Sequence, residues 1–97
     1  MESEQIYERI IHFDPIKEHQ VRLTLGEFRG VEYLHLRKYY EDFDGTWKPS
    51  NEGIAMPLDL HNSRELFSGL VEILSLAESR GVIEEHFSDL IKGLYVT

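Results

Sequence analysis

Residues 28–53, FRGVEYLHLRKYYEDFDGTWKPSNEG, contain an alternating segment that lies between two glycine-containing turns. Leu34 and Leu36 alternate with larger polar and aromatic side chains, which is the pattern of a strand with one face toward a core. The opposite face of this strand is expected to carry Tyr33, His35, Arg37 and Tyr39. Three rings and an arginine on a face that the core does not require are the first indication of a binding surface.

The segments on either side predict further strands. Val21–Leu25 (VRLTL) alternates in the same way, and Arg29-Gly30 is placed to join it to the next strand as a hairpin. Asp42–Gly45 predicts a second turn, and Ser50–Gly53 predicts a loop. A short strand, Ile54–Met56, follows the loop, and Met1–Pro15 favours a strand over a helix because it is rich in strand formers.

The second half has helical periodicity. A helix is predicted between Asn62 and Ser79, with Asn62 or Ser63 as N-cap and Gly81 as the stop signal, and a short helix over about Ile83–Leu94. The fold class is therefore α+β, with an antiparallel sheet followed by helix. The first helix is apolar over more surface than one sheet face requires. We expect a dimer interface there, formed by Leu66, Phe67, Leu70, Val71 and Leu74.

Length and composition set limits on the class of protein. Ninety-seven residues predict one domain with a core at about 20–80, and so small a core favours a homodimer. There is no cysteine, no targeting segment is recognisable at the N-terminus, and no apolar stretch approaches the roughly 20 residues of a membrane span. We therefore expect an intracellular protein of the cytoplasm or nucleoid, or of the nucleus in a eukaryote, with no membrane partner.

The sequence offers little for catalysis. The five histidines lack the spacing of a metal site, and there is no nucleophile or phosphate-loop motif. Carboxylate runs such as Glu84-Glu85 are typical of solvated helix faces. We expect no metal, no cofactor and no enzymatic activity.

Single-stranded nucleic acid binding requires cations for phosphates and rings for base stacking, and the segment from Arg22 to Lys48 supplies both. The candidate cations are Arg22, Arg29, Arg37, Lys38 and Lys48, and the candidate rings are Phe28, Tyr33, Tyr39, Tyr40 and Trp47. Strand aromatics also have a simpler explanation in packing, and Trp47 fits stacking or packing beneath a loop equally well. The net charge of −8 opposes a phosphate-rich partner at long range.

Residues 28–56 resemble the positive cofactor four (p15) family of transcriptional coactivators and single-stranded DNA-binding proteins. The resemblance rests on an ordered set of short pieces, which are Phe28-Arg29-Gly30, Arg37, Tyr39-Tyr40, Asp44-Gly45, Lys48-Pro49 and Gly53-Ile54. It implies a curved four-stranded antiparallel sheet followed by a helix through which two chains dimerise. It also implies that the sheet surface and hairpin ridges bind single-stranded or melted DNA with little sequence preference, in transcription or in DNA replication and repair.

Family DNA-contact positions are matched by Phe28, Arg29, Arg37, Tyr40 and Lys48. Both Arg37 and Tyr40 are expected to lie off the Leu34/Leu36 core face. Val31 and Glu52 depart from the pattern, because family members often carry lysine there, and residues 81–97 extend beyond the family's minimal domain. Two rivals remain open: a protein-interaction module that kept the scaffold and lost DNA, with transcription-machinery proteins as partners, and a single-stranded RNA binder.

Overall fold

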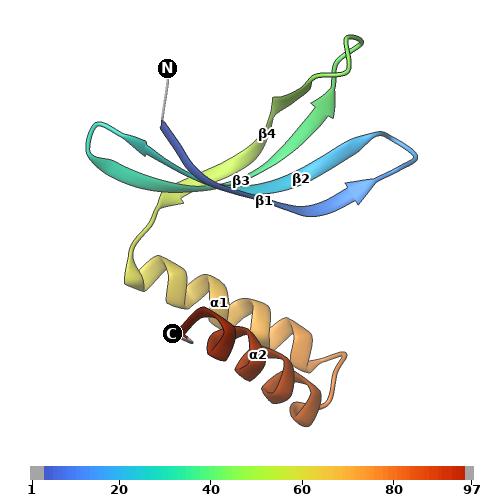
Figure 1. The fold of residues 1–97 in the computed structure, drawn as a ribbon. Coiled ribbons are helices and arrows are strands. Elements are labelled where there is room, and N and C mark those ends of the chain that lie inside the picture. Colours follow the sequence, from blue (N-terminus) through green and yellow to red (C-terminus); the bar gives the residue numbers. More distant parts are fainter. Residues whose placement is uncertain (1–3, 96–97) are drawn as a thin grey trace. The chain divides into compact units, whose positions relative to one another are not determined.

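The computed structural model describes residues 4–95. Residues 1–59 and 60–97 form two compact units, and the expectation of a single domain stays a prediction. The first unit is a curved, four-stranded antiparallel sheet in the order β1-β2-β3-β4 (Figure 1). Its strands are β1 (Glu4–Asp14), β2 (His19–Phe28), β3 (Val31–Glu41) and β4 (Trp47–Pro57). The predicted α+β class with a sheet preceding helices is confirmed, as is the N-terminal strand over the residues described.

Local backbone chemistry sets the turns between strands. Arg29 and Gly30 both have positive φ, 52° and 79°, which is the conformation of a two-residue hairpin turn whose twist matches its strands. In the β3–β4 turn, Gly45 has φ 85° and its N–H donates to the carbonyl of Asp42 over 2.9 Å. Both predicted hairpin turns are therefore present, and the first places Phe28 at the end of its strand.

The strand register divides the sheet into two faces. Leu23 lies opposite Leu36 and Leu25 lies opposite Leu34, so the predicted leucine face is confirmed. Because paired residues share a face and successive residues alternate, the same register assigns every other side chain. We call Val21, Leu23, Leu25, Leu34, Leu36, Ile54 and Met56 the apolar face. We call the opposite surface, which carries Arg22, Thr24, His35, Arg37, Tyr39 and Trp47, the polar face.

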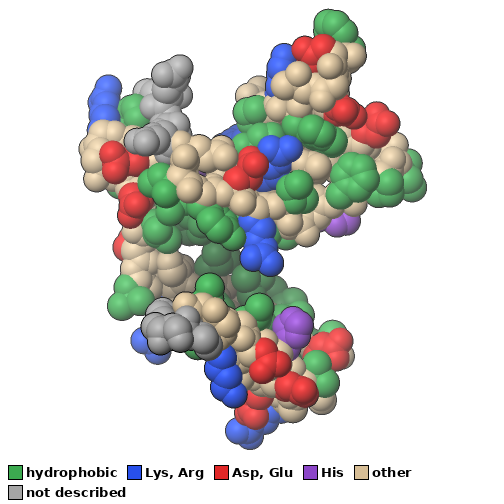
Figure 2. All heavy atoms as spheres, in the orientation of Figure 1, with side chains coloured by type: hydrophobic (Ala, Val, Ile, Leu, Met, Phe, Trp, Pro, Cys, Tyr) green, Lys and Arg blue, Asp and Glu red, His purple; other side chains and the backbone are tan. Residues whose placement is uncertain are grey.

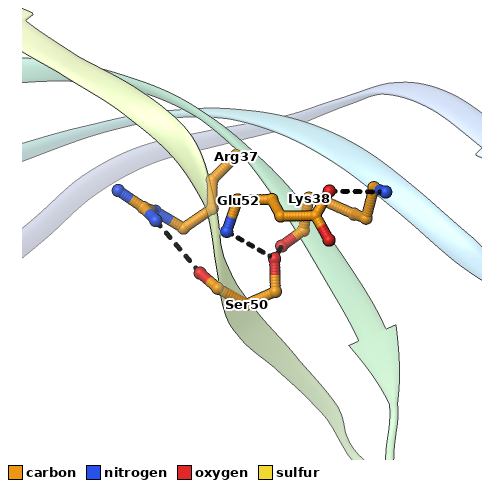
Figure 3. Close-up of polar contacts among 4 residues, drawn as sticks. All are labelled: Arg37, Lys38, Ser50 and Glu52. Atoms are coloured by element: carbon orange, nitrogen blue, oxygen red, sulfur yellow. Dashed lines mark hydrogen bonds and ion pairs between the residues drawn. The ribbon is translucent and has the colours of Figure 1, made fainter.

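The loop predicted at Ser50–Gly53 is wrong, because β4 runs without interruption through these residues. The register passes from Arg37 opposite Gly53 to Tyr39 opposite Pro49, so the extra residues form a bulge. Hydrogen bonds explain how turn-forming residues remain in the strand. Ser50 Oγ donates to the Lys38 carbonyl over 2.8 Å and accepts from the Glu52 N–H over 3.1 Å (Figure 3).

The second unit is a helical hairpin of α1 (Leu60–Ser75) and α2 (Arg80–Tyr95), in contact through Phe67 and Phe87 at 5.6 Å between ring centroids. The predicted helix limits are wrong at three points. The first helix begins at Leu60, directly after Asp59, a residue type favoured at N-caps, so Asn62 and Ser63 lie in its first turn.

The first helix also ends before Gly81, which lies within α2. Ser79 is the N-cap of the second helix, since its carbonyl accepts from the Ile83 N–H and its Oγ accepts from the Val82 N–H. With 16 residues, α2 is as long as α1 rather than short.

Neither unit encloses an apolar core. Among the residues described, no hydrophobic side chain is buried, and Thr24 at 7% exposure is the buried polar residue. Ile54 on the apolar face is 57% exposed, and Phe67 on α1 is 52% exposed despite its ring contact. Figure 2 accordingly shows hydrophobic side chains at the surface of both units. Each unit therefore presents apolar area that folding of the single unit leaves in contact with water.

Candidate nucleic acid interface

Arg22 occupies the centre of the polar face. Its guanidinium lies 4.4 Å from the ring centroid of Tyr39 and 5.9 Å from that of Trp47. Glu8 accepts from its Nη1 over 2.8 Å, and Gln20 accepts from its Nε over 2.8 Å. With its side chain 13% exposed, Arg22 is a cation held in position beside two aromatic rings.

Trp47 extends this aromatic group toward β1. Its ring meets Phe13 edge to face, with centroids 6.3 Å apart and planes at 75°. Trp47 therefore packs against a neighbouring ring on the polar face, where its indole remains partly exposed. Sequence reasoning missed Phe13, because the β1 bulges between Gln5 and Tyr7 and between Ile10 and His12 break the alternation that would have placed it.

Arg37 is fixed by the backbone of β4. It lies opposite Gly53, where an added Cβ would approach Cα, Cβ and Cγ of Arg37 at 2.9 Å. Arg37 Nη1 donates to the carbonyl of Ser50 over 3.0 Å (Figure 3). The glycine thus gives Arg37 the space to lie across the bulge, with guanidinium donors left for a ligand.

A pocket of about 280 Å³ lies on the polar face beside these groups. Its lining includes Gln5, Thr24, His35, Arg37, Tyr39 and Pro49. Burial, and then the charge of Arg37, hold the pKa of His35 below its ordinary value of 6.5, so the imidazole is neutral at pH 7. Gln5 and Thr24 were not predicted as functional, because nothing in their spacing marks them.

The predicted site residues do not form one cluster. Arg22, Phe28, Arg37, Tyr39 and Trp47 share the polar face, whereas Tyr40 and Lys48 form a pair on the apolar face. Arg29 lies in the β2–β3 turn, with its guanidinium 5.0 Å from the Phe28 ring centroid. The expectation that Tyr40 lies off the Leu34/Leu36 face is wrong, because Tyr40 follows Arg37 by three positions and an odd spacing changes the face.

Carboxylates accompany several of the candidate cations. Lys48 forms an ion pair with Asp42 at 2.5 Å, and Lys38 forms one with Glu52 at 2.9 Å. The hydrogen bond from Lys48 lowers the pKa of Asp42, and the same bond raises the pKa of Lys48. In Figure 2, Lys and Arg side chains are separated by other groups on the visible surface. Glu52 thus neutralises a neighbouring cation.

The residues predicted for dimerisation lie together on α1. Leu66, Phe67, Leu70 and Leu74 are exposed and Val71 is half-buried. They remain candidates for an interface. In the part of the chain that is described, no three His, Asp or Glu side chains group as metal ligands, and no helix has the length and apolarity that a membrane span requires.

The family model described as Transcriptional Coactivator p15 (PC4) matches residues 17–63. A solved structure is similar over 93% of this chain and 97% of its own, with 29% identity and a TM-score of 0.69. It is described as the bacteriophage T5 homolog of the eukaryotic transcription coactivator PC4, implicated in recombination-dependent DNA replication. A PC4 homolog from Burkholderia pseudomallei covers 77% of this chain and 97% of its own, with 23% identity and a TM-score of 0.49. No curated protein matches the chain.

Proposed function

We propose that this chain, which is similar to PC4 homologues, binds single-stranded or melted DNA with little sequence preference. The T5 homolog is implicated in recombination-dependent DNA replication, which supports a DNA-binding role for a chain that matches it over 93% of its length. DNA replication, recombination or transcription inside the cell is the process in which we expect it to act.

The arrangement around Arg22 is the observation that carries this proposal. A cation that lies beside Tyr39 and Trp47 combines phosphate attraction and base stacking at one place. Arg37 lies opposite Arg22 on the same face and adds a second guanidinium. None of these groups reads a base sequence by itself, because every base has a face that can stack and every nucleotide has a phosphate.

We call Arg22, Arg37, Tyr39 and Trp47 on the polar face the phosphate track, and the track has two further parts. Phe28 with Arg29 provides a ring and a cation at the β2–β3 hairpin. Tyr40 and Lys48 provide the same pair of groups on the apolar face, next to the β3–β4 turn. We infer that Tyr40 and Lys48 contact a DNA strand that passes over the edge of the sheet at the β3–β4 hairpin.

We also propose a homodimer, with α1 at the interface. The support is the exposed apolar surface of both units, since neither one covers its own hydrophobic residues. A second copy of the chain supplies apolar surface of the same extent, and small domains commonly gain stability in this way.

The direct test is titration of fluorescein-labelled oligo-dT with the full chain at low and at moderate salt, followed by anisotropy. We expect saturable binding at micromolar protein that weakens as salt rises, with much weaker binding to duplex DNA of the same length. Arg37→Ala and Tyr40→Ala should each reduce the affinity. Absence of binding to oligo-dT at micromolar protein in low salt would refute the proposal.

A protein-interaction module is the second candidate, and the carboxylates support it. Glu8 and Asp42 each neutralise a cation of the phosphate track, and Glu52 neutralises Lys38. The net charge of −8 also repels phosphates at long range. Pull-down from lysate with and without nuclease separates the two functions. The module is favoured if identified protein partners remain bound after nuclease treatment and the chain does not bind oligo-dT. Competition with oligo-U of the same length tests whether the chain binds RNA.

A further inference from the structure

The pocket on the polar face differs chemically from the phosphate track beside it. Its lining contains an amide, a hydroxyl, a neutral imidazole, a phenol ring and one guanidinium, with no carboxylate. Most of these groups donate and accept hydrogen bonds without carrying charge. A neutral heterocycle with donors and acceptors on its edge fits this lining better than a free anion does.

The polar groups of the pocket are available to a ligand. Within the described residues, the side chains of Gln5, Thr24 and His35 make no hydrogen bond. Thr24 and His35 lie opposite each other on β2 and β3, so their side chains project on the same side of the sheet. They therefore present a hydroxyl and an imidazole side by side, and Gln5 contributes an amide from β1.

Two further features connect the pocket to a polynucleotide. Tyr39 lines it while also contacting Arg22, so one ring belongs to both the pocket and the phosphate track. Arg37 lines it as well, and after its bond to Ser50 it retains donors for a phosphate next to an inserted base. A volume of about 280 Å³ lies just below the range of roughly 300–1,000 Å³ for drug-sized ligands, which suits a single base.

We propose that this pocket binds one unstacked nucleobase of the bound strand, with its polar edge against Thr24, His35 and Gln5 and its ring beside Tyr39. This inference rests on the proposed function and deepens it, because it adds a base-accepting position to a surface otherwise built for phosphates and stacking. Such a pocket would favour binding of melted over paired DNA, because the hydrogen-bonding edge of a paired base is occupied by its partner base and cannot enter the pocket.

The test uses the full chain and compares a short oligo-dT with an oligomer of the same length in which a single nucleotide is abasic. We expect the wild-type chain to bind oligo-dT more tightly by roughly tenfold, the scale of one stacked base. His35→Leu should reduce this preference several-fold. His12→Leu removes a histidine from the apolar face of β1 and should leave the preference unchanged.

Gln5→Leu provides a second variant on the edge strand, in case His35→Leu does not fold. Deoxynucleosides, which lack phosphate, are the second probe, and they should shift the amide resonances of Thr24 and His35 where inorganic phosphate does not. If the wild-type chain binds oligo-dT and neither pocket variant changes the preference, the pocket inference is overturned while the proposed function stands. If no oligonucleotide binds, the proposed function fails, and the nucleoside titration then decides the pocket separately.

Discussion

Arg22 and Arg37 lie directly opposite each other on β2 and β3, so two guanidinium groups project from the same face of the sheet. Like charges at such a cross-strand pair repel. Each has its own acceptor on a different outer strand, Glu8 on β1 for Arg22 and the Ser50 carbonyl on β4 for Arg37. The sheet thus keeps two cations together, and the carboxylate of Glu8 offsets half of their charge.

Glu8→Gln should tighten binding to oligo-dT several-fold at low salt. The change removes the carboxylate that pairs with Arg22 and leaves an amide that still accepts a hydrogen bond. If Arg22 then neutralises one more phosphate, the slope of log K against log salt should steepen by about 0.7. Anisotropy titrations at four salt concentrations measure both quantities.

Glu84→Gln is the matched control, because it removes the carboxylate of an ion pair with Arg80 on α2 and changes the net charge equally. An equal gain in both variants would mean that net charge, rather than the Arg22 position, sets the affinity.

Gly53→Ala should destabilise the protein by about 1–3 kcal/mol, because a Cβ at 2.9 Å from three Arg37 atoms, one of them Cα, forces strand and side chain apart. It should also weaken oligo-dT binding by displacing Arg37.

Gly69→Ala on α1 is the control, and it is expected to increase stability where Gly53→Ala decreases it. Nothing lies within 4 Å of an added Cβ there, and alanine in a helix is favoured by about 0.5–1 kcal/mol. Urea unfolding measures both, and equal effects would contradict the close contact.

Asp42→Asn should change how stability depends on pH. The folded-state pKa of Asp42 lies below its ordinary value of 3.8, first because of the Lys48 hydrogen bond and then because of the Phe43 amide. A lowered folded-state pKa contributes stability above the unfolded pKa, and this contribution is lost as pH falls through the folded pKa. As the pH falls from about 5 through the folded-state pKa of Asp42, the wild-type chain should therefore lose more stability than the variant.

Melting temperatures measured across that range provide the comparison. Asp89→Asn on α2, an aspartate with no ion pair to a described residue, should leave the acid profile as in the wild type. A wild-type profile in the Asp42→Asn variant would show that the Lys48 pair is absent in solution.

Leu70→Glu should convert a dimer into monomers and lower the melting temperature, since Leu70 is 52% exposed on the apolar surface of α1. Ser68→Glu adds the same charge at an exposed polar position of this helix and should leave the mass unchanged. Analytical ultracentrifugation gives the mass of both variants. A monomeric wild-type chain, or a dimeric Leu70→Glu variant, would contradict an interface at this position.

Period-two patterns predicted most of the sheet, because the leucines of β2 and β3 do form one face. Predictions failed where hydrogen bonds override local preference. Ser50 bonds to the Lys38 carbonyl and turns an apparent loop into a bulge, and Ser79 rather than Gly81 marks the boundary between helices. The alternation of the sequence already places Tyr40 on the face of Leu34 and Leu36, and the expectation did not follow it. Phe13 could not be placed from the sequence, since its face depends on the bulges of β1.

Trp47 emission during titration with unlabelled oligo-dT shows whether DNA binds the polar face, because Trp47 is the only tryptophan of the chain and lies on that face. We expect saturable quenching as bases stack near the indole, with the same affinity as in the anisotropy titration. The affinity should fall in the Arg37→Ala variant and as salt rises. Binding that leaves Trp47 emission unchanged would place the DNA elsewhere on the protein, and the assignment of the polar face as its binding surface would then be wrong.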